Sequence, residues 1–259
     1  MLDSQLIASA FLTRMFPRPV QQSVLPPAPP RPRRPVQVIG DIHGRADLLD
    51  MLLDAIEFSG DLVFLGDIAD RGPHSAQALE TVFHLQSEAP DQVKCLRGNH
   101  EVMLLQFLDR PTSLGRRWLR SGGAATLESF GLPYLDDFST NAELTQTRDR
   151  LRTKLPFGLE EWLRALPTEV RSGNVVMTHA GLDPNKPLDQ QVDRARIWGC
   201  HDAMRVARND GFWSVHGHYI VEKPVFRADF IALDTGAYES DRLTMAKIDP
   251  DGQVGFVST

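Results

Sequence analysis

The chain has 259 residues, of which 42% are hydrophobic and 24% charged, a composition typical of a soluble globular protein with one large domain. It contains no run of about 18 apolar residues, which excludes a membrane-spanning helix. Its net charge of −6 argues against a nucleic-acid-binding surface. Its two cysteines, Cys95 and Cys200, lack the spacing of zinc ligands, so we expect no disulfide framework, no structural zinc and a reducing, cytoplasmic location.

The first 35 residues differ in composition from the rest of the chain. Eight prolines lie between Pro17 and Pro35, and residues 1–36 carry five arginines against one aspartate. Such proline density removes backbone donors and favours extended geometry. We therefore expect residues 1–35 to form a disordered Pro/Arg-rich tail and residues 36–259 to form the folded domain.

Strand, loop and helix alternate three times after the tail. Apolar segments predict strands at residues 36–41, 61–67 and 92–98, each of which ends in a glycine-containing loop. Helical spacing of apolar residues predicts helices at residues 46–56, 75–86 and 101–108. This alternation indicates an α/β fold with a central sheet.

Residues from about 110 to 170 break this alternation and predict a helical insertion. Helix-like segments cover residues 141–155 and 159–167, and no strand is evident. The strand pattern resumes at residues 175–181, 214–221, 229–235, 242–249 and 253–257. Because long helices do not separate these later strands, we expect a second sheet packed on the first.

Polar clusters follow the predicted strands directly. Since loops at the carboxyl ends of strands converge in α/β sheets, we expect the clusters to share one crevice. Histidine and carboxylate ligands suit manganese, iron or zinc. Any one cluster alone is more often a turn, and a lone histidine is more often a packed or surface residue than a ligand, which is how we interpret His74, His84 and His201. Five clusters in one context indicate a metal site, and they contain Asp41, His43, Asp67, Asp70, Asn99, His100, His179 and His218.

The ordered motifs GDIHG, GDIADRG, RGNHE, HAG and GH resemble the phosphoprotein phosphatase family within the calcineurin-like metallophosphoesterases. The match runs from about Val36 to Ile248, with intervals of 26, 32, 80 and 39 residues from Asp41 through Asp67, Asn99 and His179 to His218. SGGAATLESFG and LDTGAYESDRLTMAKI resemble the bacterial branch that includes symmetrical diadenosine tetraphosphate hydrolases. The resemblance implies an α/β sandwich of two mixed central sheets flanked by helices.

The resemblance also implies roles for individual residues. His100 would protonate the leaving oxygen, and Asp70 would orient His100 and favour its protonated form. Arg71 and Arg97 would hold phosphate oxygens. Two divalent metal ions would be bound by Asp41 and His43 at the first position, by Asp67 as the bridge, and by Asn99, His179 and His218 at the second position.

The chain departs from the family pattern at two places. Bacterial members carry an arginine two residues after a tryptophan, where this chain has Cys200. If Trp198 lies on a strand, Arg196 shares a strand face with that position and could replace the missing arginine. The GHxH motif of the wider superfamily is absent, and His216, at i−2 from His218, is open to a supporting or a packing role.

Together these features predict a hydrolase in which a metal-bridging hydroxide attacks phosphate monoesters. The resemblance favours a serine/threonine protein phosphatase that uses manganese, with iron or zinc also possible. A dinucleoside polyphosphate hydrolase is the alternative, so the substrate is a phosphorylated protein or a small phosphate or nucleotide. A weakly catalytic protein that recruits partners through its Pro-rich tail is a rival of another class. The oligomeric state stays open.

Overall fold

The computed structural model describes residues 28–57, 59–227 and 229–259. Its first sheet has five strands in the order β10-β9-β1-β2-β3. Strands β1, β2 and β3 are parallel, and β9 and β10 run antiparallel to their neighbours. The strands are β1 (Val36–Ile39), β2 (Asp61–Phe64), β3 (Val93–Cys95), β9 (Thr244–Ile248) and β10 (Val254–Ser258).

The second sheet also has five strands, in the order β4-β5-β6-β8-β7. Strands β5, β6 and β8 are parallel, while the edge strands β4 and β7 are antiparallel to them. The strands are β4 (Glu169–Ser172), β5 (Val175–Thr178), β6 (Trp213–His216), β7 (Val225–Arg227) and β8 (Phe230–Ala232). Two mixed sheets confirm the predicted α/β fold class.

The sheets pack face to face over an apolar layer. Along β2, Val63 enters this layer, while Leu62 and Phe64 face the helices on the other side, as the two-residue period of a strand requires. Met177 and Val215 supply the facing side of the layer from the second sheet. A close-packed core of this kind holds the strand ends, and the loops that follow them, in fixed positions.

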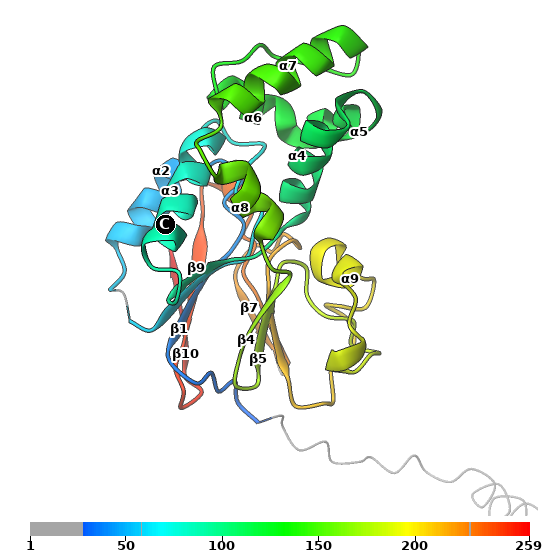
Figure 1. Ribbon diagram of the computed structural model, residues 1–259. Coiled ribbons are helices and arrows are strands. Elements are labelled where there is room, and N and C mark those ends of the chain that lie inside the picture. The colour runs from blue at the N-terminus through cyan, green and yellow to red at the C-terminus, as the bar shows by residue number, and fades with distance from the viewer. Residues whose placement is uncertain (1–27, 58, 228) are drawn as a thin grey trace, which may run out of the picture.

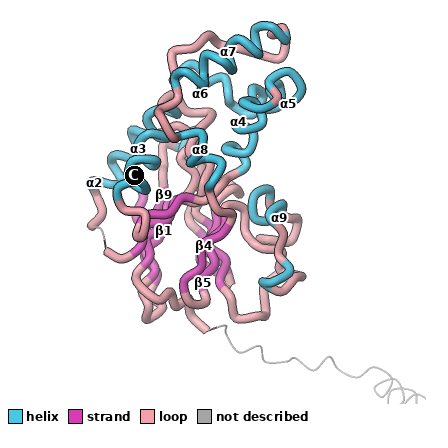
Figure 2. Tube along the Cα trace, viewed as in Figure 1, coloured by secondary structure: helices cyan, strands magenta, loops and turns pink. Residues whose placement is uncertain are grey.

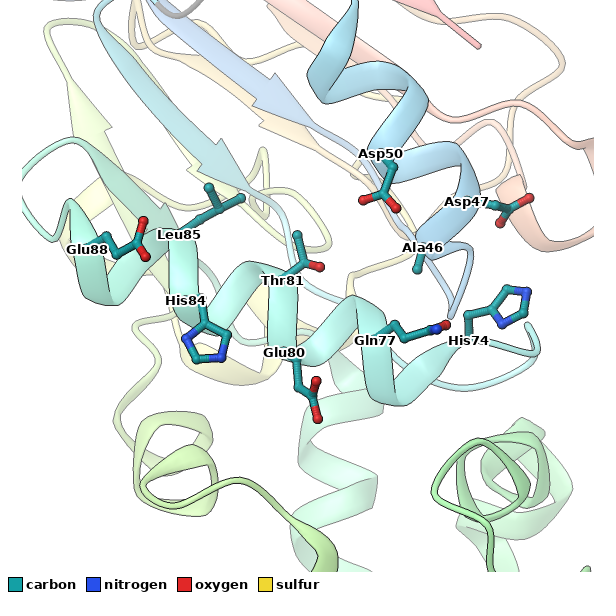
Figure 3. A pocket seen from close by; sticks show the side chains of 10 residues that line it. All are labelled: Ala46, Asp47, Asp50, His74, Gln77, Glu80, Thr81, His84, Leu85 and Glu88. Atoms are coloured by element: carbon teal, nitrogen blue, oxygen red, sulfur yellow. The ribbon is translucent and has the colours of Figure 1, made fainter.

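Helices α2 (Ala46–Asp54), α3 (Ser75–Glu88) and α4 (Asn99–Asp109) follow the first three strands, and α9 (Asp193–Trp198) lies beside the second sheet (Figure 1). Leu48, Leu49 and Leu52 bury one face of α2 in the core. A polar groove runs between α2 and α3, and the exposed side chains of His74 and His84 lie along it (Figure 3). Their exposure agrees with the expectation of surface histidines.

The insertion consists of helices stacked beyond one end of the sandwich, as the colouring of Figure 2 shows. Helices α5 and α6 are joined by a π-helical segment with a kink at Gly122. Thr140 and Glu143 form a capping box that begins α7. The elements are α5 (Pro111–Trp118), the π segment Leu119–Gly123, α6 (Ala124–Ser129), α7 (Asn141–Lys154) and α8 (Leu159–Ala165), after which β4 already begins at Glu169.

Three local expectations differ from the structure. Strand β6 ends at His216, and His218 has φ of 64°, so these two histidines do not share a strand face. Trp198 is the last residue of helix α9 and not part of a strand. Strand β7 was not predicted, because its three residues are too short to give a periodic signal.

Residues 28–35 contact the domain, although the sequence places them in the tail. The indole nitrogen of Trp213 donates to the carbonyl of Ala28 at 2.7 Å, and the side-chain oxygen of Asn174 accepts from the amide of Arg31 at 2.6 Å. Pro30 and Pro32 are buried. The remainder of the predicted tail lies outside the described residues. Within the part of the chain that the structure describes, no helix has the length and apolar composition needed to cross a bilayer.

Candidate active site

The predicted metal ligands converge at the ends of the strands. Asp41 and His43 follow β1, Asp67 follows β2, His179 follows β5, and His218 follows β6. The strands that precede these residues belong to both sheets, and their carboxyl ends lie at the edge of the sandwich that faces the helical insertion (Figure 1). The carboxyl ends of parallel strands share one edge, which explains how residues far apart in sequence meet.

The loops that carry these residues have unusual backbone conformations. Among the described residues, six other than glycine have positive φ, and five of them belong to this site: His43, Asp67, Asp70, Arg71 and His218. The left-handed region costs a residue with a Cβ about 1–2 kcal/mol. Such a concentration of disfavoured conformations is typical of a functional site whose surroundings impose the geometry.

Two glycines allow the carboxylates to approach the backbone. A Cβ on Gly217 would lie 1.8 Å from Oδ1 of Asp41, and a Cβ on Gly98 would lie 2.1 Å from Oδ1 of Asp67. Both distances are far below van der Waals contact. Any larger residue at these positions would therefore displace a predicted ligand.

The first group of potential metal ligands consists of His43, Asp67 and His100, whose ligand atoms lie within 4.8 Å of one another. Nδ1 of His43 donates to the carbonyl of Ala69 at 3.0 Å, which leaves Nε2 as the unprotonated nitrogen. That nitrogen faces Oδ2 of Asp67 at 3.6 Å. Burial lowers the pKa of His43 to about 3, so its imidazole is neutral and Nε2 is an acceptor. A cation fits between this nitrogen and the carboxylate oxygen of Asp67.

The second group consists of Asp67, His179 and His218. Nδ1 of His179 donates to the carbonyl of Leu65 at 3.0 Å, and Nε2 lies 2.9 Å from Oδ1 of Asn99 and 3.4 Å from Oδ1 of Asp67. Nδ1 of His218 also lies 2.8 Å from Oδ1 of Asn99. Burial lowers the pKa of His179 and brings that of His218 to about 4, which keeps both imidazoles in the neutral form that binds metals.

Asp67 belongs to both groups, which is the arrangement expected of a bridging ligand. Burial disfavours its charge, but the neighbouring His179, His100 and His43 outweigh burial and hold the pKa of Asp67 below its usual range. The carboxylate of Asp41 accepts a hydrogen bond from the backbone amide of His218 at 3.1 Å. Burial, with the nearby charges of Asp234 and Asp67, raises the pKa of Asp41, so a divalent cation would relieve a real electrostatic penalty here.

His100 lies between a carboxylate and a guanidinium. Its Nδ1 is 2.7 Å from Oδ2 of Asp70, and its Nε2 is 3.4 Å from Nη2 of Arg71. Burial would lower the pKa of His100, but Asp67 and Asp70 together raise it. Arg71 also lies over the ring of Tyr238 at 4.6 Å. A histidine that is held by a carboxylate and directed toward the ligand cluster can act as a proton donor.

The structure places the other two predicted arginines differently. Arg97 donates through its guanidinium to the carbonyl of Arg164 at the end of α8. Arg196 forms ion pairs with Glu169 at 2.7 Å and Asp193 at 3.2 Å. Arg196 lies on helix α9 and not on a strand, so the strand argument for it is wrong, and these two carboxylates engage its guanidinium.

Sequence reasoning missed several residues that support the site. Glu101 accepts from the amides of Asp67, Ile68 and Gly98 at 2.8 Å each. Burial, with the charge of Asp67, raises the pKa of Glu101 to about 7. Glu101 ends the RGNHE motif, so the signal for it was present. Two other missed residues, Asp234 and Tyr238, lie in the LDTGAYESDRLTMAKI segment. The last two, Trp118 and Thr126, lie in the insertion, and both contact Asp70.

Comparison with known proteins gives a consistent result. The sequence pattern described as calcineurin-like phosphoesterase matches residues 34–227. A symmetrical bis(5'-nucleosyl)-tetraphosphatase of Legionella pneumophila is 30% identical over 206 residues, which are 77% of this chain and 62% of that protein. The chain thus spans about three fifths of the length of that relative.

Two further proteins align with this chain over most of its length and most of their own. Serine/threonine-protein phosphatase 2 of Salmonella typhimurium is 26% identical over 226 residues, which are 83% of this chain and 93% of that protein. A crystal structure provisionally described as a diadenosine tetraphosphatase has a TM-score of 0.60 at 22% identity and covers 87% of this chain and 94% of that one. At this identity the structural likeness concerns the fold alone.

Proposed function

The chain belongs to the calcineurin-like phosphoesterase family, and we propose that it is a two-metal phosphoesterase whose substrates are phosphate monoesters, in particular phosphoserine and phosphothreonine in proteins. The observation that carries this proposal is the convergence of two groups of potential ligands on Asp67, the first of which includes His100. Imidazole and carboxylate donors of this kind suit manganese, iron or zinc.

Two bound divalent metal ions would lower the pKa of a water molecule and neutralise charge on the phosphoryl group. The residues of the chain supply the rest. His100 donates a proton from Nε2 to the leaving oxygen as the bond between phosphorus and that oxygen breaks, and it later regains a proton from solvent. Asp70 holds Nδ1 of His100, which keeps Nε2 directed into the crevice.

Arg71 supports phosphate binding from the same loop as Asp70. Its guanidinium lies next to His100 and against the face of Tyr238, which restricts its orientation. A planar guanidinium with several donors matches two phosphate oxygens at once. We therefore assign to Arg71 the main charged contact with the substrate, with Arg97 as a second candidate that would have to leave the carbonyl of Arg164.

A dinucleoside polyphosphate hydrolase is the second candidate function. It is favoured by the similarity to the Legionella pneumophila relative, which is named a symmetrical bis(5'-nucleosyl)-tetraphosphatase. The same ligand groups would serve both reactions, since each breaks a bond between phosphorus and oxygen. The two functions differ in the leaving group, which is an alcohol in one case and a nucleotide in the other.

A manganese-supplemented activity screen tests the proposal. Phosphopeptides, p-nitrophenyl phosphate and diadenosine tetraphosphate are compared at equal concentration, and iron and zinc replace manganese in parallel assays. Release of inorganic phosphate from phosphopeptides supports the first function, and preferential formation of ADP from diadenosine tetraphosphate supports the second. Absence of turnover with every metal and substrate would reject both and favour a binding protein.

A further inference from the structure

The carboxylate of Asp70 receives hydrogen bonds from the helical insertion as well as from His100. The indole nitrogen of Trp118 lies 2.8 Å from Oδ2 and 3.1 Å from Oδ1 of Asp70, and the hydroxyl of Thr126 lies 2.6 Å from Oδ1. Trp118, Thr126 and Asp70 are all fully buried. Water therefore does not compete for these contacts, and each of them has the strength of a charge-assisted hydrogen bond.

The chemistry of these groups determines the direction of the hydrogen bonds. An indole nitrogen can only donate, so both oxygens of Asp70 are acceptors toward Trp118. The Thr126 hydroxyl accepts from the amide of Asp70 at 3.0 Å and can therefore use its own hydrogen for Oδ1. With Trp118 and Thr126 both donating to its carboxylate, Asp70 acts as an acceptor, and Nδ1 of His100 carries the proton between the two side chains.

The insertion is built to hold these two donors in place. The ring of Trp118 packs on Phe107 with 4.6 Å between ring centroids, and a Cβ on Gly123 would lie 2.3 Å from the indole. At the kink, Gly122 has φ of 108°, and its carbonyl accepts from the amide of Arg71 at 3.1 Å. The insertion thus contacts the loop of Asp70 and Arg71 through its backbone and through two side chains.

We propose that Trp118 and Thr126 are positioning residues for proton transfer, so that the helical insertion sets the orientation of the acid that protonates the leaving group. They act through Asp70, because their hydrogen bonds fix the orientation of its carboxylate. His100 is thereby held with its Nδ1–H donating to Asp70, and the proton that it transfers, on Nε2, is directed at the substrate. This inference rests on the proposed function, in which His100 is the proton donor.

The first test replaces one donor without removing the ring. Trp118→Phe keeps the aromatic packing and loses the indole N–H, and Trp162→Phe is the matched control, because Trp162 donates its indole N–H to Gln86 in the contact between α8 and α3. For Trp118→Phe we expect kcat on phosphoserine peptides to fall roughly 10- to 100-fold. On p-nitrophenyl phosphate, whose leaving group needs no proton, the loss should stay below about threefold. KM and metal content should stay unchanged in both variants.

The second test uses a pair of substitutions at Thr126. Thr126→Val has nearly the same shape but lacks the hydroxyl, whereas Thr126→Ser retains it. The valine variant should show the same selective loss on phosphoserine peptides, and the serine variant should be close to the original protein. This pair decides the matter if Trp118→Phe does not fold. An equal loss on both substrates, or the same loss with valine and serine, overturns the inference.

The third test does not depend on activity. In the zinc-loaded protein with ¹⁵N-labelled histidine, the ring nitrogen signals of His100 report the protonation and hydrogen bonding of each nitrogen. We expect Nδ1 to carry a proton in the original protein and in Trp162→Phe, and the Nδ1 signal to shift in Trp118→Phe and Thr126→Val, because the acceptor Asp70 is no longer held in place. Unchanged His100 signals in both of these variants overturn the inference. Should the original protein lack turnover while these signals change, the proposed function fails and the positioning by the insertion stands.

Discussion

The strand-end loops and the helical insertion contribute to the site in opposite ways. Five strand-end segments carry the predicted metal ligands, and five residues of these segments adopt disfavoured left-handed conformations. The insertion reaches the same site mainly through Trp118, Thr126 and the carbonyl of Gly122, all of which contact the segment of Asp70 and Arg71. Under the proposed function, one region would hold the reacting groups, and the other would hold the residues that orient them.

This difference shows that residues of a site and the residues that position them are not equally recognisable in a sequence. The loops carry charged and imidazole groups in short motifs, because metal chemistry needs those groups. The insertion carries a tryptophan and a threonine that look like ordinary core residues. Substitutions in the loops should therefore remove function, and substitutions in the insertion should weaken it selectively.

Asp67→Asn should produce the largest effect. An amide at this position is a weaker ligand in both groups, so we expect the loss of bound metal and of nearly all turnover while the fold persists. Metal content by elemental analysis and secondary structure by circular dichroism check this expectation. Retention of two tightly bound metal ions with normal activity would remove the basis for assigning the loops as the metal site.

His100→Asn should give the next largest effect and should separate acid catalysis from metal binding. Loss of a positioned proton donor lowers turnover by roughly 10²–10⁴, and the loss should shrink on p-nitrophenyl phosphate. His100 is also close enough to His43 and Asp67 to belong to a ligand group. Loss of one metal ion in this variant would assign His100 as a ligand and contradict its role as the acid.

The predicted arginines give a smaller and graded effect. Arg71→Ala removes a charged contact with a dianion, which corresponds to about 1.5–3 kcal/mol, or roughly 10- to 150-fold in kcat/KM. Arg196→Ala is the comparison, because the guanidinium of Arg196 is paired with Glu169 and Asp193. We expect it to change kcat/KM less than about threefold while lowering the melting temperature. A tenfold fall in kcat/KM for Arg196→Ala would restore it as a phosphate ligand.

Truncation at the amino terminus should have the smallest effect and should act on stability alone. Deletion of residues 1–34 removes the contacts of Ala28 and Arg31 with the domain, whereas deletion of residues 1–27 retains them. We expect the longer deletion to lower stability by about 1–2 kcal/mol, or roughly 2–8 °C in Tm. The shorter deletion should leave Tm and turnover on small substrates unchanged, and differential scanning calorimetry compares the two. Equal melting temperatures would show that residues 28–34 add nothing to the fold.

Much of the architecture was predictable from sequence because strands and polar clusters alternate. Buried strands such as β1 and β2 followed by glycine-containing loops indicated both the sheet and the positions of Asp41 and Asp67. The helical character of the insertion was also visible from its composition. The strand limits were less accurate, since His216 and His218 look like alternate residues of one strand until the left-handed turn at His218 is known.

Other features depend on tertiary contacts that sequence spacing does not reveal. The sequence around Arg196 left a strand possible because this short segment has no clear period, and the structure shows helix α9 instead. Trp118 contacts Asp70 across 48 residues, and Thr126 contacts it across 56. No local pattern encodes such distances, although the SGGAATLESFG segment, which contains Thr126, stood out as a resemblance.

The contact between Asp41 and His218 joins residues that are 177 positions apart and that follow strands of different sheets. Asp67 and His179 are joined across the sheets in the same way. A cation held among these side chains is therefore a cross-link between the two halves of the sandwich. Because any ligand that binds only the folded chain stabilises it by mass action, removal of metal should loosen the docking of one sheet on the other as well as stop the reaction. The ions that take part in the reaction would thus also stabilise the packing of the two sheets.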